Sequence, residues 1–287
     1  MASFRSWAGE RKAGRASGGL LTARPLRRRL MSDRQRETDM RHILIAAALA
    51  AAFSIAGAAS SAPASAFIAA AVADAHRPAA DAARDGARKP AEMLAFAGVK
   101  PGDKVLEILP GGGYFTRLLS KAVGPGGHVW AAVPDPKSKF AEPAAAPIAA
   151  DPAYANVSVI TIGPAAMTAL PPLDLIWTSQ NYHDLHLTEA HTDVPALDKL
   201  WLGILKPGGT LIVIDHVALP GSPATATADK LHRIDPAVVR QEVEGAGFKF
   251  DGQSDALRNP ADPHTAIVFD PSIRGKTDQF AFRFRKP

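Results

Sequence analysis

The chain carries the stretch VLEILPGGGY at residues 105–114, in which a short apolar run ends directly at three glycines. The run has the length and composition of a buried strand, and residues from about Tyr114 to Val123 have the apolar spacing of a helix. Glycines let the backbone approach a ligand closely, and the first turn of a helix offers unpaired N–H groups. These residues therefore predict a ligand-binding turn between a strand and a helix.

Strands and helices continue to alternate after this turn, which predicts an α/β protein. Further strands are predicted at residues 128–133, 157–162, 173–179, 210–217, 248–255 and 279–285, and further helices at 194–205 and 236–246. Such alternation is typical of a mostly parallel sheet with helices on both faces and ligands at the carboxyl ends of the strands. Residues 67–97 are expected to form one or two helices broken near Pro78 and Pro90. Residues 135–155 are expected to be a surface excursion, and 206–209 a turn.

Composition and charge exclude several classes of protein. The 287 residues contain no cysteine, which excludes thiol catalysis, disulfides, iron–sulfur clusters and cysteine zinc sites. The formal net charge is +5, but residues 1–66 hold 11 Lys and Arg against 4 Asp and Glu, whereas residues 67–287 hold 22 against 24. Because the basic residues lie in the prefix, the folded part is not expected to bind nucleic acid.

The prefix has the pattern of a secretory signal peptide. After Met40 come Arg41, His42, an apolar run at 43–59 and the small-residue stretch SSAPASA at 60–66, so cleavage is expected after Ala66. The 17-residue run is shorter than the ~20 apolar residues that a spanning helix prefers, so a retained anchor is the less favoured alternative. The protein is expected to be exported, periplasmic or secreted, with no stable membrane anchor. The predicted division is a basic disordered prefix or mispredicted start at 1–39, a signal peptide at 40–66, a helical segment at 67–97 and one domain at 98–287.

The glycine turn alone leaves the ligand open. A dinucleotide fingerprint would need a third glycine where Thr116 stands, and the Gly-Lys-Ser/Thr of a P-loop is absent. A glycine turn without any ligand is the remaining alternative.

Longer stretches resemble a known family. Residues 105–114, the lead-in KPGDK at 100–104 and LKPGGTL at 205–211 are similar to motifs of the class I S-adenosylmethionine-dependent methyltransferases. LPGGGY at 109–114, NYHD at 181–184, LHRIDP at 231–236 and RGKTD at 274–278 together resemble a bacterial group of exported predicted methyltransferases. The resemblance covers about residues 85–287. It implies a Rossmann-like, mostly parallel seven-stranded sheet whose last strand is antiparallel, with S-adenosylmethionine as methyl donor.

The resemblance also implies a set of cofactor-binding residues. The backbone of Pro110, Gly111, Gly112, Gly113 and Tyr114 would pass the methionine part of the donor. Glu107 would lie near its ammonium group, and Asn181 would lie beside the donor. Two positions depart from the family pattern: Leu109 replaces the first glycine, and Val133 replaces the acid that bonds the ribose. Asp135, two residues further on, is the candidate substitute.

The loop at 181–184 supplies the candidate catalytic residues, because it follows a predicted strand and should reach the sheet's carboxyl edge. His183 could accept a proton from a hydroxyl or amine acceptor, with Asp184 orienting the imidazole. The ring of Tyr182, or that of Tyr114, could face the sulfonium cation. Alternatively, these residues serve only as turn and cap residues.

Other polar clusters give weaker predictions. The spacing of His183, His186 and His191 with Asp184 is no recognised ligand set, so no metal is expected. Asp215-His216, at a strand end, is left undecided. Two polar segments, 258–262 and 274–278, flank an apolar stretch at 266–269; they form either a wall for the acceptor or, as favoured here, solvated loops. Trp130, Trp177 and Trp201 are expected in the core.

The leading hypothesis is a methyltransferase that acts on an unknown acceptor, by default a small molecule. The alternative is a catalytically inactive binding module of the same fold in the periplasm. A nicotinamide-dependent oxidoreductase is disfavoured by Thr116. The sequence does not predict an oligomeric state.

Overall fold

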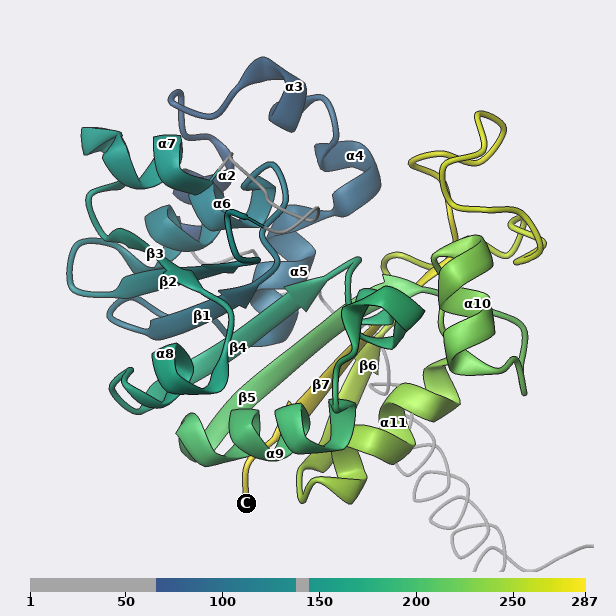
Figure 1. Ribbon diagram of the computed structural model, residues 1–287. Coiled ribbons are helices and arrows are strands. Elements are labelled where there is room, and N and C mark those ends of the chain that lie inside the picture. Colours follow the sequence, from purple (N-terminus) through teal and green to yellow (C-terminus); the bar gives the residue numbers. More distant parts are fainter. Residues whose placement is uncertain (1–65, 138–144) are drawn as a thin grey trace, which may run out of the picture. The chain divides into compact units, whose positions relative to one another are not determined.

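The computed structural model describes residues 66–137 and 145–287, and these contain one seven-stranded sheet in the order β3-β2-β1-β4-β5-β7-β6 (Figure 1). Neighbouring strands pair in parallel from β3 to β5, and β7 runs antiparallel to both β5 and β6. The prediction of a mostly parallel sheet with an antiparallel last strand is confirmed. The strands are β1 (Lys104–Ile108), β2 (His128–Val133), β3 (Val157–Thr161), β4 (Leu173–Ser179), β5 (Leu205–His216), β6 (Lys249–Ser254) and β7 (Gln279–Arg285).

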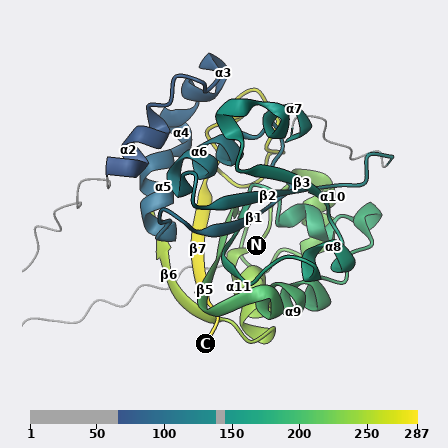
Figure 2. The ribbon, with the colours of Figure 1, turned by 90° about the vertical axis from the view of Figure 1, so that its left-hand side faces the viewer.

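Helices cover both faces of this sheet, as Figure 2 shows with α5 and α6 on one side and α8 and α9 on the other. The described α-helices are α2 (Ala66–Val72), α3 (Ala79–Ala82), α4 (Asp85–Arg88), α5 (Pro90–Ala97), α6 (Tyr114–Val123), α7 (Ala145–Ala150), α8 (Pro164–Thr168), α9 (Val194–Ile204), α10 (Ala224–Leu231) and α11 (Pro236–Gly245). Short 3-10 helices are η1 (Pro152–Tyr154), η2 (His183–His186) and η3 (Thr188–Ala190). Residues 67–97 thus form four short helices rather than one or two.

Two apolar cores explain why the strands are apolar on both faces. Successive side chains of a strand point to opposite faces. In β5, Ile212 and Ile214 join the core that α2, α5 and α6 cover, whereas Leu211 and Val213 join the core that α9 and α11 cover. Burying both faces holds the carboxyl edge of the sheet in a fixed position.

Strand β5 begins earlier than the sequence predicts. Leu205 already pairs with Leu173 of β4, and the register then shifts so that Thr210 pairs with Leu175. The segment 206–209, predicted as a turn, is therefore an irregularity inside a longer strand. It is held there by the residue after β7, since the Gly208 amide donates to the Lys286 carbonyl at 3.0 Å and the Lys286 amide donates to the Gly209 carbonyl at 2.9 Å.

The segment predicted as a surface excursion contributes to the core. Within its described part, α7 buries Ile148 and η1 buries Tyr154 in the core that α6 also covers. The alanines of α7 let it pack closely, a role that the Ala/Pro-rich composition conceals. The predicted prefix 1–39 and signal-peptide residues 40–65 lie outside the described residues.

Among the described residues, no helix is long and apolar enough to cross a membrane.

Candidate active site

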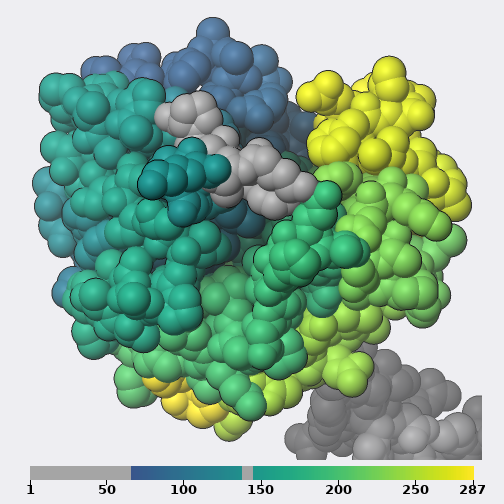
Figure 3. Space-filling model, viewed as in Figure 1, coloured from purple at the N-terminus to yellow at the C-terminus, as the bar shows by residue number. Residues whose placement is uncertain are grey.

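A cavity of about 620 Å³ opens at the carboxyl ends of β1, β4 and β5. Its walls come from the turn after β1, the loop after β4, the end of β5, the end of α10 and the loop after β6. That last loop, yellow in Figure 3, stands beside α10, where the Val268 amide donates to the Leu231 carbonyl at 3.1 Å. The lining residues include Arg84, Arg88, Leu109, Pro110, Gly111, Gly112, Tyr114, Gln180, Asn181, His183, Asp184, His216, His232 and Phe269.

The glycine turn has two parts: one faces the cavity, and the other packs against α7. Pro110, Gly111 and Gly112 line the cavity. Gly113 has a φ of +76° and does not line the cavity; a Cβ on it would lie 2.0 Å from Cδ1 of Ile148 in α7. Gly113 is thus required for helix packing rather than for ligand contact.

Leu109, which stands where the resembling family has a glycine, adopts a left-handed backbone with a φ of 51°. Such a conformation costs a residue with a Cβ about 1–2 kcal/mol. The turn therefore keeps its left-handed geometry without the glycine, and the Leu109 side chain becomes part of the cavity wall.

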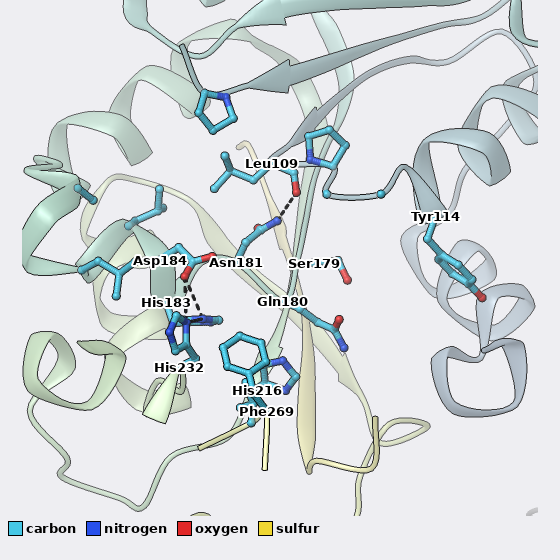
Figure 4. A pocket seen from close by; sticks show the side chains of 18 of the residues that line it. Leu109, Tyr114, Ser179, Gln180, Asn181, His183, Asp184, His216, His232 and Phe269 are labelled. Carbon is cyan, nitrogen blue, oxygen red and sulfur yellow. Dashed lines mark hydrogen bonds and ion pairs between the residues drawn. The ribbon is translucent and has the colours of Figure 1, made fainter. Parts of the chain in front are cut away.

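Tyr114 lies on the side of the cavity away from the 181–184 loop (Figure 4). Its hydroxyl donates to Asp85 Oδ1 at 2.6 Å, and burial raises its pKa. The guanidinium carbons of Arg88 and Arg84 lie 4.8 and 5.0 Å from its ring centre. Because these cations already occupy the ring, Tyr114 is poorly placed to face a sulfonium.

Arg88 brings positive charge to the same wall. Its guanidinium donates to the Gln180 side chain, and burial lowers its pKa to about 10 although the charge of Glu107 opposes this shift. Glu107 itself is buried in β1 and does not line the cavity. The predicted contact of Glu107 with the donor ammonium therefore stays a prediction.

Asp135, the predicted ribose ligand, also lies outside the cavity. It is exposed and accepts a hydrogen bond from the Lys137 amide at 2.8 Å, within its own loop. Val133, at the end of β2, is buried.

Asn181 joins two edges of the site. Its Nδ2 donates to the carbonyls of Ile108 and Leu109 at 3.1 and 2.6 Å, and its Oδ1 accepts from Thr178. Figure 4 shows this bond to Leu109. Asn181 lines the cavity as predicted, and its side chain fixes the loop after β4 against the glycine turn.

Tyr182 is a correction to the sequence prediction, because its ring does not face the cavity. It is fully buried among core residues, and its hydroxyl lies 2.9 Å from Asp198 Oδ2 and 3.2 Å from Glu242 Oε2. Consecutive residues of a turn point in different directions, so Tyr182 turns inward while His183 turns toward the cavity.

His183 lies between two carboxylates. Its Nδ1 is 2.8 Å from Asp215 Oδ1, and its backbone N–H donates to Asp215 Oδ2 at 2.7 Å. Its Nε2 lies 3.1 Å from Asp184 Oδ1. Burial alone would lower the pKa of His183, but Asp215 and Asp184 outweigh it and raise the pKa to about 10. The two carboxylates thus favour the protonated imidazole, so Nε2 must release its proton before it can accept one from an acceptor or bind another ligand.

Asp184 connects His183 to a histidine that lies far away in the sequence. Asp184 Oδ1 is 3.4 Å from Nδ1 of His232, at the end of α10 (Figure 4). Burial would raise the pKa of Asp184, but hydrogen bonds from His183 and His232 lower it to about 2. His186 is not in this cluster, since its Nε2 lies 3.1 Å from Glu242. The sequence does not predict His232 as a site residue, although it lies in the stretch LHRIDP at 231–236, and it leaves the role of Asp215 undecided.

His216 completes the floor of the cavity beside His183. Its Nδ1 lies 2.7 Å from the Thr277 hydroxyl, and burial lowers its pKa to about 4. It is therefore a neutral hydrogen-bonding group at physiological pH.

The loop after β6 reaches the cavity through its apolar stretch at 266–269, whereas neither of the flanking polar segments, 258–262 and 274–278, lines the cavity. Val268 and Phe269 line the cavity. Asp262 holds the loop through Arg233, with two bonds of 2.8 and 3.0 Å between fully buried side chains. Ile267 and Phe269 remain 37% and 52% exposed, so they form an apolar lip. The buried ion pair, which the sequence pattern does not reveal, fixes this loop.

Comparison with solved structures supports the fold. The chain is 20% identical to an S-adenosylmethionine-dependent methyltransferase from Aquifex aeolicus over 71% of this chain and 93% of that one, with a TM-score of 0.50. It also matches fibrillarin from Aeropyrum pernix, in complex with natively bound S-adenosylmethionine (13% identity, 70% and 76% coverage, TM-score 0.44). A third match is a TehB-like methyltransferase from Corynebacterium glutamicum (14% identity, 70% and 87% coverage, TM-score 0.45). No protein-family model and no curated protein matches the sequence. The Aquifex similarity shows that the chain has a Rossmann-like methyltransferase fold.

Proposed function

We propose that this protein is an S-adenosylmethionine-dependent methyltransferase acting on a small-molecule acceptor that is not yet identified. The observation that supports this most directly is the cavity at the edge of β1 and β4. It is lined on one side by Pro110, Gly111 and Gly112 and on another by Asn181, His183 and Asp184. In open α/β sheets, ligands bind at this edge. A volume of about 620 Å³ lies within the range of small-molecule sites.

The solved structures add to this proposal. The matched proteins from Aquifex aeolicus and Aeropyrum pernix are, respectively, an S-adenosylmethionine-dependent methyltransferase and a protein with that compound bound. Bound here, the donor would supply an electrophilic methyl group, and the chain would contribute mainly by positioning the acceptor for in-line attack. Asn181 would hold the loop after β4 against the glycine turn, and the Phe269 side chain at the cavity entrance would cover apolar parts of the acceptor.

A pair of glycine variants tests the donor site without disturbing the fold. A Cβ on Gly112 would meet no atom within 4 Å, and its φ is not in the left-handed range, so Gly112→Val should fold. The added side chain would occupy the cavity wall and block a ligand that passes the backbone. Gly126→Val is the matched control, because Gly126 is equally unhindered but does not line the cavity.

The two variants are compared by isothermal titration with S-adenosylmethionine and with its demethylated product. The proposal expects binding by the wild type and Gly126→Val, and at least a tenfold loss by Gly112→Val. Equal affinity of all three proteins would show that the donor binds elsewhere on the molecule. No binding by the wild type would show that the protein does not bind this donor.

A catalytically inactive binding module is the second candidate. It is favoured by the lack of an acidic side chain from residues 128–137 in the cavity wall, where the family pattern expects a ribose ligand. Transfer of a labelled methyl group to a small-molecule extract of the source cells separates the two candidates. Donor binding without any labelled product in such extracts would favour the binding module.

We also propose that the protein is exported. The supporting feature is the signal-peptide pattern at 40–66. The first described helix, α2, begins at Ala66 and buries Ile68 and Ala71, so cleavage after Ala66 would leave its core contacts in place. Expression in a Gram-negative host should give a periplasmic protein that begins at Phe67, and Leu49→Arg should abolish processing. A cytoplasmic, unprocessed wild-type protein would contradict export.

A further inference from the structure

We infer that His183, Asp184 and His232 form a binding site for a divalent transition-metal ion in the wall of the cavity. Each of the three side chains offers one ligand-type atom, and these atoms lie within 4.8 Å of one another; Figure 4 shows the contacts of Asp184 with the two histidines. His183 Nε2 lies 3.1 Å from Asp184 Oδ1 and 3.2 Å from His232 Nδ1, and the third side of this triangle, from Asp184 Oδ1 to His232 Nδ1, is 3.4 Å.

The dimensions of this triangle fit one face of a metal coordination sphere. Protein nitrogen and carboxylate ligands lie about 2.0–2.2 Å from zinc, which separates neighbouring ligands in a tetrahedral site by about 3.3 Å. The observed sides of 3.1, 3.2 and 3.4 Å are close to that spacing. An ion could therefore bind all three atoms from slightly above their plane without rearrangement of the backbone.

Asp215 holds His183 in the orientation that a metal ligand needs. Its Oδ1 lies 2.8 Å from His183 Nδ1, so that nitrogen carries the hydrogen and Nε2 points toward the cluster. A carboxylate behind the far nitrogen is a common support for metal-binding histidines. The second carboxylate oxygen of Asp215 also accepts the His183 backbone N–H at 2.7 Å, which fixes the residue further.

The other two ligands are also held in place. His232 ends α10 in a left-handed conformation (φ 51°), and its ring packs against Phe269 at 4.9 Å between centres. Asp184 belongs to η2, one residue after His183. Elements far apart in the sequence thus bring the three ligands together, which is why the spacing of His183, His186 and His191 does not reveal the site.

The cluster faces the cavity, since all three residues line it. Three protein ligands leave at least one coordination position open to water or to a bound molecule, as in catalytic rather than structural sites. Two imidazoles with one carboxylate suit zinc, iron, cobalt or manganese better than calcium or magnesium, which prefer oxygen ligands. If the proposed function holds, an acceptor hydroxyl bound to the ion would lose its proton more easily; the metal site itself does not depend on that function.

Cobalt(II) titration of the untagged, chelator-treated full chain tests the site through visible absorption, with zinc as competitor. The wild type should bind one ion per chain. His232→Gly removes a ligand at a position whose left-handed backbone glycine adopts readily, and should weaken binding at least tenfold. Asp184→Asn should also weaken binding.

His191→Gly is the matched control, since His191 has the same left-handed backbone (φ 49°) but lies outside the cluster. It should bind cobalt like the wild type, and circular dichroism should show all variants folded. No cobalt band for the wild type at millimolar metal, or equal losses in His191→Gly and His232→Gly, would overturn the site. Because no donor is present in this titration, its outcome is separate from that of the donor-binding test.

Discussion

Asp198 of α9 should make the protein less stable at alkaline than at acidic pH. Its side chain is fully buried, and the Tyr182 hydroxyl lies between it and Glu242. Burial raises the pKa of Asp198 to about 7, and the nearby charge of Glu242 adds to this effect. In the unfolded chain the carboxyl ionises near its ordinary pKa of 3.8. Between these two pKa values the folded state therefore binds a proton that the unfolded state has lost.

The sign and size of the effect follow from this difference. A raised carboxyl pKa contributes destabilisation that grows as the pH rises from the unfolded pKa to the folded one and is then constant. Each pH unit in this window costs about 1.4 kcal/mol, so Asp198 should lower the free energy of unfolding by about 3 kcal/mol between pH 5 and pH 8. Asp198→Asn cannot ionise and should lack this loss. Asp198 Oδ1 has no hydrogen-bond partner among the described residues, so the Asn amide also places a polar atom there without a partner, at a cost that is the same at both pH values.

Urea unfolding followed by tryptophan fluorescence measures the difference, since Trp201 is buried in the same core. The stability of Asp198→Asn relative to the wild type should improve by about 3 kcal/mol on going from pH 5 to pH 8. Asp255→Asn, at an exposed position, is the control and should show no such trend. Parallel pH dependence of Asp198→Asn and the wild type would refute the reasoning, because Asp198 would then be ionised throughout.

Three further substitutions test the positions of single residues. Gly113→Ala should lower the free energy of unfolding by about 1–3 kcal/mol, through left-handed strain and displacement of Ile148; an unchanged melting temperature would contradict this. Asp262→Ala should cost about 3–5 kcal/mol in urea unfolding, because it leaves the buried Arg233 unpaired, and a loss below 1 kcal/mol would contradict it. Tyr182→Phe should cost about 1–3 kcal/mol yet leave donor affinity unchanged, since the hydroxyl bonds only within the core; weakened donor binding would contradict that.

The sequence predicts those parts of the fold that depend on local pattern. The strand Leu173–Ser179 and the helix Tyr114–Val123 have the predicted bounds, because an apolar run after two prolines marks the strand and glycines flank the helix. The turn at 206–209 is wrongly predicted, since Pro-Gly-Gly is a turn signal, yet the segment continues into β5 and its glycines bond to the backbone of Lys286 after β7. Local composition cannot show what the neighbouring strand provides.

The site is predicted less completely than the fold. Gly111, Gly112, Asn181 and Asp184 line the cavity, as expected from their place after strands. The sequence does not predict the direction of each side chain: Tyr182 turns into the core although it follows Asn181 directly. The contact of His183 with His232, 49 residues apart, is set by the packing of α10 on η2 and has no local signal.

A crystal structure of the protein with the demethylated product of S-adenosylmethionine would test the central claim most directly. The account predicts density for the ligand along Pro110, Gly111 and Gly112, with its sulfur facing the loop at 181–184. Density at another place on the molecule, or an empty cavity at saturating ligand, would contradict it.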